Sequence, residues 1–266
     1  MSYPYLNTPG PLGFAHRGFS REGLENSLPA FRAAAALGFG YLETDVRTTS
    51  DGVLLAFHDA TLDRVAGAGG PVGKLSYRQI QSARIGGRAA IPTFEQLLTE
   101  LPGLRLNVDI KDAAGSAELA RLLEKHDAHE RVLVTSFSDR RRLAALRILR
   151  RAGRRSASSA GAVFTALTVL LGPFGLTGLL ARAGRYQCLQ VPPRYGPVKV
   201  VTPSFLRRCH RAGLQVHVWT VNEPAEMERL LDEGVDGLVS DRADLLAEIL
   251  AERAVWPQRD PKGMAG

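Results

Sequence analysis

The sequence predicts an α/β fold of the (βα)8 TIM-barrel class, and three observations support this prediction. Short apolar runs alternate with stretches of helical periodicity, which is typical of βα units around a parallel sheet. The length of 266 residues suits one barrel, since such barrels take about 250 residues. Charged residues follow several apolar runs, where barrel enzymes place their active sites. We therefore expect one domain over residues 1–256 and a flexible tail over 257–266.

The periodicity and the capping residues define the expected elements. The predicted strands span residues 12–16, 40–47, 53–58, 104–110, 132–136, 154–158, 187–191, 214–220 and 236–239. The predicted helices span residues 27–37, 76–82, 93–100, 116–126, 138–152, 162–171, 176–183, 203–212, 224–233 and 242–253. Asn26 or Ser27 is expected to cap the first helix and Thr93 or its neighbour the third, while Pro224 suits a first helical turn.

Nine strands are predicted, one more than an eight-stranded barrel needs, and a hairpin accounts for the additional strand. The dipeptide Asp51-Gly52 lies between two apolar runs and is a strong hairpin signal. With these two residues as the turn, Asp45 should face His58 on the returning arm. Residues 53–58 would then bring His58 back to the acidic residues without forming a stave of the barrel.

The connection over residues 60–92 is expected to be a short insertion after the His58-Asp59 segment. It contains several glycines, and a long connection in a compact domain is usually functional.

The stretch from Ala160 to Leu180 carries no charge over about twenty residues, which is nominally enough to span a bilayer. Gly172 and Pro173 interrupt it, so two short apolar helices packed on the barrel are the favoured interpretation. Contact of residues 160–184 with a membrane surface or an acyl chain is the alternative, and a true span is the least favoured.

The formal charge of +7 does not indicate a nucleic-acid partner. Of the 34 basic residues 29 are arginine, which in an Ala- and Gly-rich chain indicates coding bias. No nucleic-acid-binding module or basic stripe with interleaved aromatics is present. The positive field can still attract an anionic substrate or a membrane surface.

Two cysteines, Cys188 and Cys209, form no disulfide framework and no metal-ligand pair. The first residues lack the basic and apolar regions of a secretory signal. The expected location is therefore the cytoplasm, with peripheral membrane contact as the alternative.

Three carboxylates are candidate metal ligands. Glu43 and Asp45 lie two apart on one strand, so both side chains point to the same face near the barrel mouth. Asp109 arrives from another strand end. Buried carboxylates need compensating charge, and all-oxygen ligation suits one hard cation, Mg²⁺ or Ca²⁺. Ion pairing with Arg17 or Lys111 is the alternative.

Two basic side chains and two histidines complete the candidate site. Lys111 shares the face of Asp109 and can meet a phosphate oxygen, and Arg17 offers a planar fork for phosphate. His16 and His58 are the candidate acid and base, because histidine exchanges protons near neutral pH. His217 shares a strand face with Trp219 and is a weaker candidate for substrate contact.

These segments together resemble the glycerophosphodiester phosphodiesterase family. The resemblance rests on His16-Arg17-Gly18, Glu25-Asn26-Ser27, Glu43-Thr44-Asp45-Val46, Ser50-Asp51-Gly52, Phe57-His58-Asp59, Asn107-Val108-Asp109-Ile110-Lys111 and Trp219-Thr220-Val221-Asn222. It implies a barrel related to phosphatidylinositol-specific phospholipase C, with Glu25 and Asn26 in the site. It also implies that Trp219 walls the pocket and that Asn222 orients a hydroxyl. The family usually has Glu where this chain has Asp109, whose side chain is one methylene shorter and bears on the metal preference.

The resemblance implies metal-dependent hydrolysis of a glycerophosphodiester to sn-glycerol 3-phosphate and an alcohol. Lysophospholipase D or cyclising phospholipase C-like activity on lipids is the first alternative, favoured if residues 160–184 form an acyl groove. Binding of polyol phosphates or lipid head groups without turnover is the second.

Overall fold

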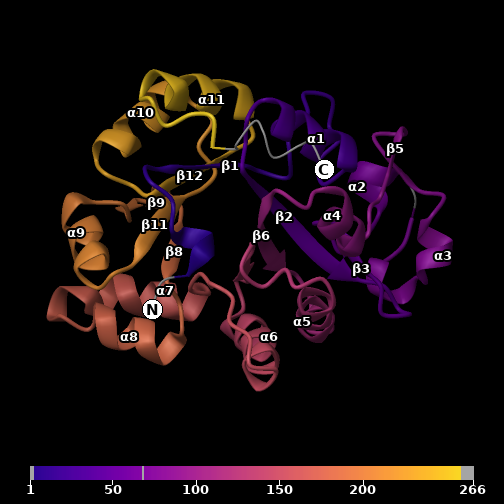
Figure 1. The fold of residues 1–266 in the computed structure, drawn as a ribbon, viewed down its shortest axis with the longest axis horizontal. Coiled ribbons are helices and arrows are strands. Elements are labelled where there is room, and N and C mark those ends of the chain that lie inside the picture. Colours follow the sequence, from indigo (N-terminus) through magenta and orange to yellow (C-terminus); the bar gives the residue numbers. More distant parts are fainter. Residues whose placement is uncertain (1–2, 68, 259–266) are drawn as a thin grey trace.

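The computed structural model describes residues 3–67 and 69–258 and contains the predicted parallel sheet. Seven strands are hydrogen-bonded in the order β7-β6-β2-β1-β12-β11-β8 and curve around a common axis (Figure 1). These are β1 (Leu12–Ala15), β2 (Tyr41–Thr48), β6 (Arg105–Ile110), β7 (Val132–Thr135), β8 (Cys188–Val191), β11 (Gln215–Val218) and β12 (Gly237–Ser240). All six pairings between them are parallel.

A short extended stretch closes the ring between β7 and β8. Ser158 forms a parallel bridge to Val134 of β7, and Ser159 forms one to Cys188 of β8. The amide of Val134 donates to the carbonyl of Ala157 at 2.9 Å, and that of Ala160 donates to Cys188 at 3.0 Å. This stretch is the eighth stave, which confirms the barrel, and it overlaps the strand predicted at 154–158.

Helices surround the strands in the βα order that the sequence predicts (Figure 1). They are α1 (Leu28–Ala36), α4 (Phe94–Glu100), α5 (Gly115–Lys125), α6 (Asp139–Arg151), α7 (Ala162–Leu171), α8 (Thr177–Gly184), α9 (Pro203–Arg211), α10 (Pro224–Asp232) and α11 (Ala243–Glu252). Ser27 caps α1 by accepting from the amide of Ala30, and Thr93 forms a capping box with Gln96. Pro224 opens α10 as expected.

The hairpin is present, but its predicted register is wrong by one residue. Strand β3 (Leu54–Ala56) runs antiparallel to β2, with Arg47 opposite Leu55, so Asp45 faces Phe57 and not His58. The turn holds three residues instead of two, since the amide of Thr49 donates to the carbonyl of Val53. Gly52 takes the left-handed conformation that ends such a turn. His58 nevertheless lines the same cavity as Asp45.

The insertion after His58 is a small folded unit with an apolar core of its own. Its elements are α2 (Asp63–Ala66), η2 (Val72–Lys74), α3 (Tyr77–Ile80), β4 (Arg84–Ile85) and β5 (Ala89–Ala90). Leu62, Val72, Ile80 and Ile85 pack with Phe57 in a cluster separate from the main core. The insertion therefore has a folded base from which α2 can reach the barrel mouth.

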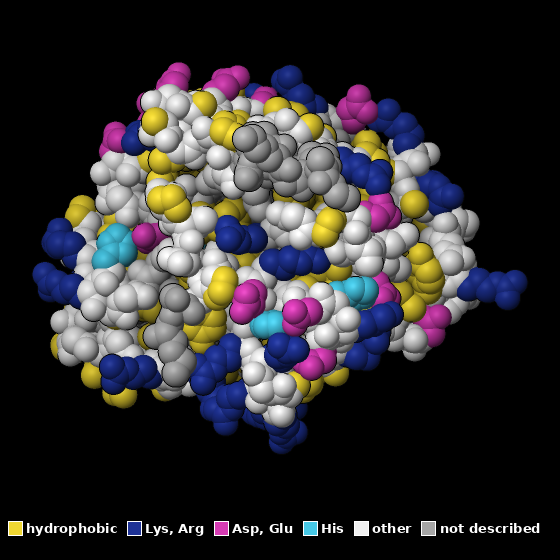
Figure 2. Space-filling model, in the orientation of Figure 1, with side chains coloured by type: hydrophobic (Ala, Val, Ile, Leu, Met, Phe, Trp, Pro, Cys, Tyr) yellow, Lys and Arg dark blue, Asp and Glu magenta, His cyan; other side chains and the backbone are white. Residues whose placement is uncertain are grey.

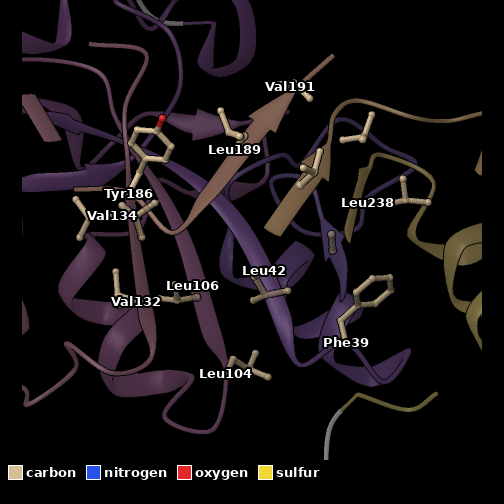
Figure 3. Packing of buried hydrophobic residues seen from close by; sticks show 14 of the residues in the cluster. Phe39, Leu42, Leu104, Leu106, Val132, Val134, Tyr186, Leu189, Val191 and Leu238 are labelled. Carbon is tan, nitrogen blue, oxygen red and sulfur yellow. The ribbon is translucent and has the colours of Figure 1, made fainter. Parts of the chain in front are cut away.

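Strand alternation divides the barrel into an outer and an inner layer. Leu42, Leu106, Val134 and Leu189 belong to the main core that packs with the helices (Figure 3). Tyr41 belongs to a second cluster with Tyr5, Phe14 and Leu133, inside the barrel. Since side chains alternate along β2, Glu43 and Asp45 share the inward face of Tyr41 but lie nearer the carboxyl end of the strand.

The first and last described segments, residues 3–6 and 256–258, pack near the amino ends of the strands. The 3-10 helix η1 (Pro4–Leu6) contributes Tyr5 to the inner cluster. Trp256 packs on Phe39 with ring centroids 4.7 Å apart, and the Gln258 side chain accepts from the amide of Gly13 at 3.1 Å. The expected tail therefore begins as a packed segment, and residues 259–266 lie outside the described part.

The uncharged segment over residues 160–180 folds as the sequence predicts. Lys and Arg side chains are spread over the face in Figure 2, with Asp and Glu among them. Helices α7 and α8 are separated by η3 (Gly172–Phe174), as Gly172-Pro173 predicts. Within the described residues, no helix has both the length and the apolar character needed to cross a bilayer.

Candidate active site

A cavity of about 660 Å³ opens at the carboxyl ends of the barrel strands and collects most of the predicted site residues. The predicted residues that line it are His16, Arg17, Glu43, Asp45, His58, Asp109, Lys111 and Trp219. Glu25, Asn26 and Asn222 are not among the lining residues. Glu25 and Asn26 instead contact Arg17 and Asp45, which do line the cavity. Asn222 contacts Asp241, which in turn holds His16.

Asp45 is the centre of an ion-pair network at the base of the cavity. Its Oδ1 lies 2.8 Å from Lys111 Nζ, and its Oδ2 lies 3.0 Å from Arg17 Nε. Burial alone would raise the pKa of Asp45, but Lys111 and Arg17 outweigh it and lower the pKa. Asp45 therefore stays ionised, and it fixes both cations on the cavity wall.

Lys111 bridges the two strands that carry the aspartates. Its Nζ lies 2.7 Å from Asp109 Oδ2 as well as 2.8 Å from Asp45 Oδ1. Burial disfavours its charge, but the two carboxylates raise its pKa, so the ammonium persists. This arrangement follows from parallel pairing, which places Asp45 of β2 beside Asp109 of β6.

Glu43 is a buried carboxylate, and no Lys or Arg side chain of the described residues forms an ion pair with it. Its Oε2 accepts from the amide of Arg17 at 3.2 Å and lies 3.8 Å from His16 Nε2. Burial and the neighbouring Asp45 raise the pKa of Glu43 to about 7. The position is thus one where a further positive charge would be strongly stabilised.

Asp109 has an unused oxygen facing this region. Its Oδ2 is paired with Lys111, whereas its Oδ1 is buried and has no hydrogen-bond partner. Burial raises the pKa of Asp109 despite the attraction of Lys111. Asn107, two residues earlier on β6 and also lining the cavity, has an equally unpartnered Oδ1.

The oxygen atoms that could bind a metal in this cavity suit a hard cation, both in their charge and in their chemical type. Three carboxylates face two cationic side chains, and Asp109 Oδ1 and Asn107 Oδ1 are oxygens without partners. Lys111 lies between Asp45 and Asp109, and the described residues contain no group of three or more His, Cys, Asp or Glu side chains arranged to hold a metal by themselves. The residues therefore fit a cation that also uses substrate or water oxygens.

His16 is held by a carboxylate that the sequence analysis did not identify. Its Nδ1 lies 2.5 Å from Asp241 Oδ1, just beyond the end of β12. Asn222 donates from Nδ2 to Asp241 Oδ2 at 2.8 Å and accepts from the Asp241 amide at 2.9 Å. Burial opposes protonation of His16, but Glu43 and Asp241 prevail and raise its pKa. Asn222 thus positions Asp241, and Asp241 positions His16.

His58 has a carboxylate partner of its own, supported from the insertion. Its Nδ1 lies 2.7 Å from Asp59 Oδ1. Arg64 of α2 binds Asp59 with two hydrogen bonds of 2.6 and 3.1 Å, and binds Glu25 with two of 2.9 and 2.7 Å. Hydrogen bonding to Arg64 lowers the pKa of Asp59 to about 2. Glu25 then accepts from Arg17 Nη1 at 2.9 Å, which links both halves of the site.

Asn26 and Trp219 have different roles in this arrangement. Asn26 is buried, donates to Asp45 Oδ2 at 3.1 Å and accepts from Thr44 Oγ1 at 2.7 Å, so it orients Asp45. Trp219 lines the cavity and packs edge-on against Phe137 with centroids 5.6 Å apart. His217 is fully buried within the barrel and is not among the lining residues.

Sequence reasoning missed Asp241, Asn107 and Arg64. Asp241 directly follows a short apolar strand, which is the same signal that identified His16 and Asp109. Asn107 lies two residues before Asp109 and shares its face. Arg64 had no comparable signal, because its role depends on how the insertion folds.

Comparisons with known proteins agree on one family. The family model described as glycerophosphoryl diester phosphodiesterase matches residues 16–245. The chain is 45% identical over 254 residues to the probable glycerophosphodiester phosphodiesterase 2 of Mycobacterium tuberculosis, covering 95% of each. The crystal structure of glycerophosphodiester phosphodiesterase from Agrobacterium tumefaciens matches with a TM-score of 0.76 and 25% identity, over 90% of this chain and 99% of that one. A phosphodiesterase from Oleispira antarctica, solved in complex with the product sn-glycerol-3-phosphate, matches with a TM-score of 0.75 and 20% identity, over 91% and 97%.

Proposed function

The chain belongs to the glycerophosphoryl diester phosphodiesterase family, and we propose that it hydrolyses glycerophosphodiesters to sn-glycerol 3-phosphate and an alcohol with one bound divalent cation. One observation carries this proposal: a single cavity brings together buried carboxylates, two cationic side chains and two histidines that each have a carboxylate partner. Phosphodiester cleavage requires a binding place for the anion, an acid and a base, and these residues supply all three.

Arg17 and Lys111 bind the phosphodiester. Both line the cavity, and both are fixed by Asp45, so neither has to be ordered when substrate arrives. Lys111 offers a point charge, while Arg17 presents a planar set of donors. Charge that accumulates on the phosphoryl oxygens during the reaction is stabilised by these fixed groups.

His16 and His58 exchange the protons. One imidazole takes a proton from the attacking oxygen and the other gives a proton to the departing alkoxide. Asp241 and Asp59 each hold one Nδ1, which leaves each Nε2 as the nitrogen that can face substrate. Such a pair of positioned groups typically contributes about 10²–10⁴-fold for each proton transfer.

Glu43, Asp45 and Asp109 hold the cation, which is Mg²⁺ or Ca²⁺. When bound, the cation polarises the phosphoryl group and favours ionisation of an oxygen nucleophile. Its positive charge would offset the burial that raises the pKa values of Glu43 and Asp109. The unpartnered Asp109 Oδ1 supports this assignment.

The test measures release of glycerol 3-phosphate from glycerophosphocholine and glycerophosphoethanolamine. Exhaustive chelation should abolish turnover, and Mg²⁺ or Ca²⁺ should restore it. Full turnover after chelation would remove the cation from the proposal while leaving the activity. No release with either cation, combined with tight calorimetric binding of glycerol 3-phosphate, would favour a binding protein instead of an enzyme.

A further inference from the structure

Two partly buried arginines, Arg47 and Arg141, lie at the rim of the active site and are called the rim arginines below. Arg47 donates from Nε and Nη2 to the carbonyl of His58, at 3.2 and 2.9 Å. Arg141, in the first turn of α6, donates from Nη1 to the carbonyl of Ile110 at 3.5 Å. Neither forms an ion pair with an Asp or Glu side chain of the described residues. Partly buried cations without counter-ions indicate a place where an anion is stabilised.

The strand register places Arg47 beside Lys111. Val46 pairs with Ile110, and the amide of Lys111 donates to the carbonyl of Val46 at 3.0 Å. Arg47 and Lys111 directly follow the two paired residues, so they are neighbours at the carboxyl ends of β2 and β6. Alternation along β2 also gives Arg47 the inward face of Asp45. An anion on Arg47 therefore lies next to a phosphate on Lys111.

Arg141 reaches the same place from α6. Its contact with the carbonyl of Ile110 sets it over the residue that precedes Lys111. Burial lowers the pKa of Arg47, Asp112 opposes this effect, and the charge of Arg141 lowers the pKa further. The two guanidinium groups are thus close enough to repel each other, and an anion between them would offset this repulsion.

Asp112 does not supply that anion. Its carboxylate accepts from the amide and the hydroxyl of Thr48 at 2.7 and 2.9 Å, and from the amide of Gly115 at 2.8 Å. These three hydrogen bonds join the end of β2 to the start of α5. Asp112 forms no ion pair with a Lys or Arg side chain of the described residues.

Other basic side chains at the cavity mouth already have acidic partners. Lys199 ends the hairpin of β9 (Arg194–Tyr195) and β10 (Val198–Lys199), which contributes to the cavity lining, and it pairs with Glu233 at 3.2 Å. Arg64 is bound to two carboxylates. The rim arginines differ in that their remaining N–H groups are available to a ligand.

We propose that the rim arginines form a second anion site, which binds a carboxylate or phosphate on the head group of the glycerophosphodiester. This inference rests on the proposed phosphodiesterase function and names its substrate class. Glycerol carries no charge, so the second anion belongs to the alcohol. Water adds across the bond between phosphorus and the head-group oxygen. Glycerol 3-phosphate keeps the new oxygen, and the anionic head group leaves as an alcohol carrying the proton.

Charge on the head group provides the first test. Release of glycerol 3-phosphate is measured at fixed ionic strength from the glycerophospho esters of 3-hydroxypropanoate, 4-hydroxybutanoate and 5-hydroxypentanoate. The matching amides have the same shape without the charge. For at least one length, kcat/KM of the acid should exceed that of its amide at least about tenfold, because hydrogen bonds between ionised groups are about twice as strong as neutral ones. Ratios near one at every length would overturn the inference.

The type of anion is tested alongside. The glycerophospho ester of 3-hydroxypropyl phosphate is compared with the three acids. A higher kcat/KM for the phosphate than for each acid would identify a phosphate site, and the reverse order would identify a carboxylate site. A phosphate and acids that are all no better than the amides would remove the site.

A matched pair of variants on α6 provides the second test. Arg141→Gln should lower the ratio of acid to amide kcat/KM at least about fivefold, since it removes a charged donor. Arg147→Gln removes the same charge from an exposed position further along the helix and should leave the ratio within about twofold. An equal loss in both variants would assign the preference to the overall positive field and would contradict a local site.

Arg47 should give a different result from Arg141. Arg47→Gln should lower both the acid-to-amide ratio and kcat for the amides, because Arg47 also holds the carbonyl of His58. A fall in kcat at an unchanged ratio would make Arg47 only a positioning residue for His58 and would contradict its place in the anion site.

The outcomes separate this inference from the proposed function. Turnover of acids and amides with equal kcat/KM leaves the phosphodiesterase and removes the second anion site. Absence of turnover for every ester, with Mg²⁺ or Ca²⁺ present, removes the proposed function and this inference with it.

Discussion

Asp241 Oδ1 lies 2.5 Å from His16 Nδ1, although 225 residues separate them in the chain. The same carboxylate is held through its other oxygen by Asn222. His58 has an equivalent partner in its neighbour Asp59, at 2.7 Å. The site therefore contains two imidazole–carboxylate pairs, one built from distant strand ends and one from adjacent residues.

Replacing Asp241 should impair the acid–base chemistry of His16. We expect Asp241→Asn to lower kcat at least tenfold, because the imidazole loses the group that fixes its orientation. It should also lower the pKa of His16, which Glu43 and Asp241 raise against the effect of burial, so the limb of the pH–rate profile due to His16 should move to lower pH. The readouts are kcat across pH and an NMR titration of the His16 ring.

The control for this experiment is Asp244→Asn, which removes an aspartate paired with Arg242 outside the cavity. It should change neither kcat nor the pH profile. A normal profile in Asp241→Asn would mean that Asp241 has only a structural role.

Asp109 should influence cation preference more than the fold. We expect Asp109→Glu to remain active and to change the ratio of activities with Mg²⁺ and Ca²⁺, because the longer side chain would relocate one oxygen of the proposed cation site. Asp109→Asn should lose at least about 10²-fold in kcat/KM, because it leaves Lys111 with fewer charged partners and removes a ligand charge. Calorimetric cation titration and kinetics with each metal are the measurements, and Asp63→Asn on the exposed α2 is the control.

Arg64 should matter for turnover far more than for stability. It is half exposed, and exposed ion pairs contribute at most about 1 kcal/mol to folding. It nevertheless ties Asp59 to Glu25, and so connects His58 with Arg17. We expect Arg64→Met to lower kcat about tenfold, with a change in unfolding free energy below about 1 kcal/mol.

A conservative replacement sharpens the Arg64 experiment. Arg64→Lys should restore little activity, because lysine cannot make two-pronged bonds to both carboxylates. Arg88→Met, which breaks an exposed pair with Glu22, is the matched control and should leave kcat unchanged. Full activity of Arg64→Met would show that the insertion does not position His58.

The sequence was sufficient to predict the barrel, because its signals are local. Alternating periodicities located the strands and helices, and the caps at Ser27 and Thr93 set two helix starts within one residue. Residues two apart on a strand share a face, which placed Glu43 with Asp45 and Asp109 with Lys111. Parallel pairing of β2 with β6 then brought these two pairs together.

The predictions that were wrong or incomplete depend on three-dimensional geometry that single residues do not reveal. The register of the hairpin followed from the length of its turn, and the dipeptide Asp51-Gly52 is compatible with two or three turn residues. The partner of His16 comes from the last strand, so pairing it required the closed ring. The role of Asn222 likewise appeared only with Asp241, since Asn222 contacts this residue and does not line the cavity.

His217 should make the fold sensitive to acid, independently of catalysis. It is fully buried, with Nε2 3.1 Å from Gln215 Oε1 and its ring 5.0 Å from that of Phe14, and burial lowers its pKa to about 3. Between pH 6.5 and this value, only the unfolded chain binds the proton, so stability is complete above pH 6.5 and is lost as pH falls. At pH 5 the loss of stability should be about 2 kcal/mol, from about 1.4 kcal/mol per pH unit.

Urea unfolding at pH 7 and pH 5 measures this loss. The difference in unfolding free energy between the two pH values should be smaller by about this amount in His217→Gln than in the unchanged protein. Phe14→Leu should instead lower stability equally at both pH values, and an unchanged pH dependence in His217→Gln would assign the acid sensitivity to other groups.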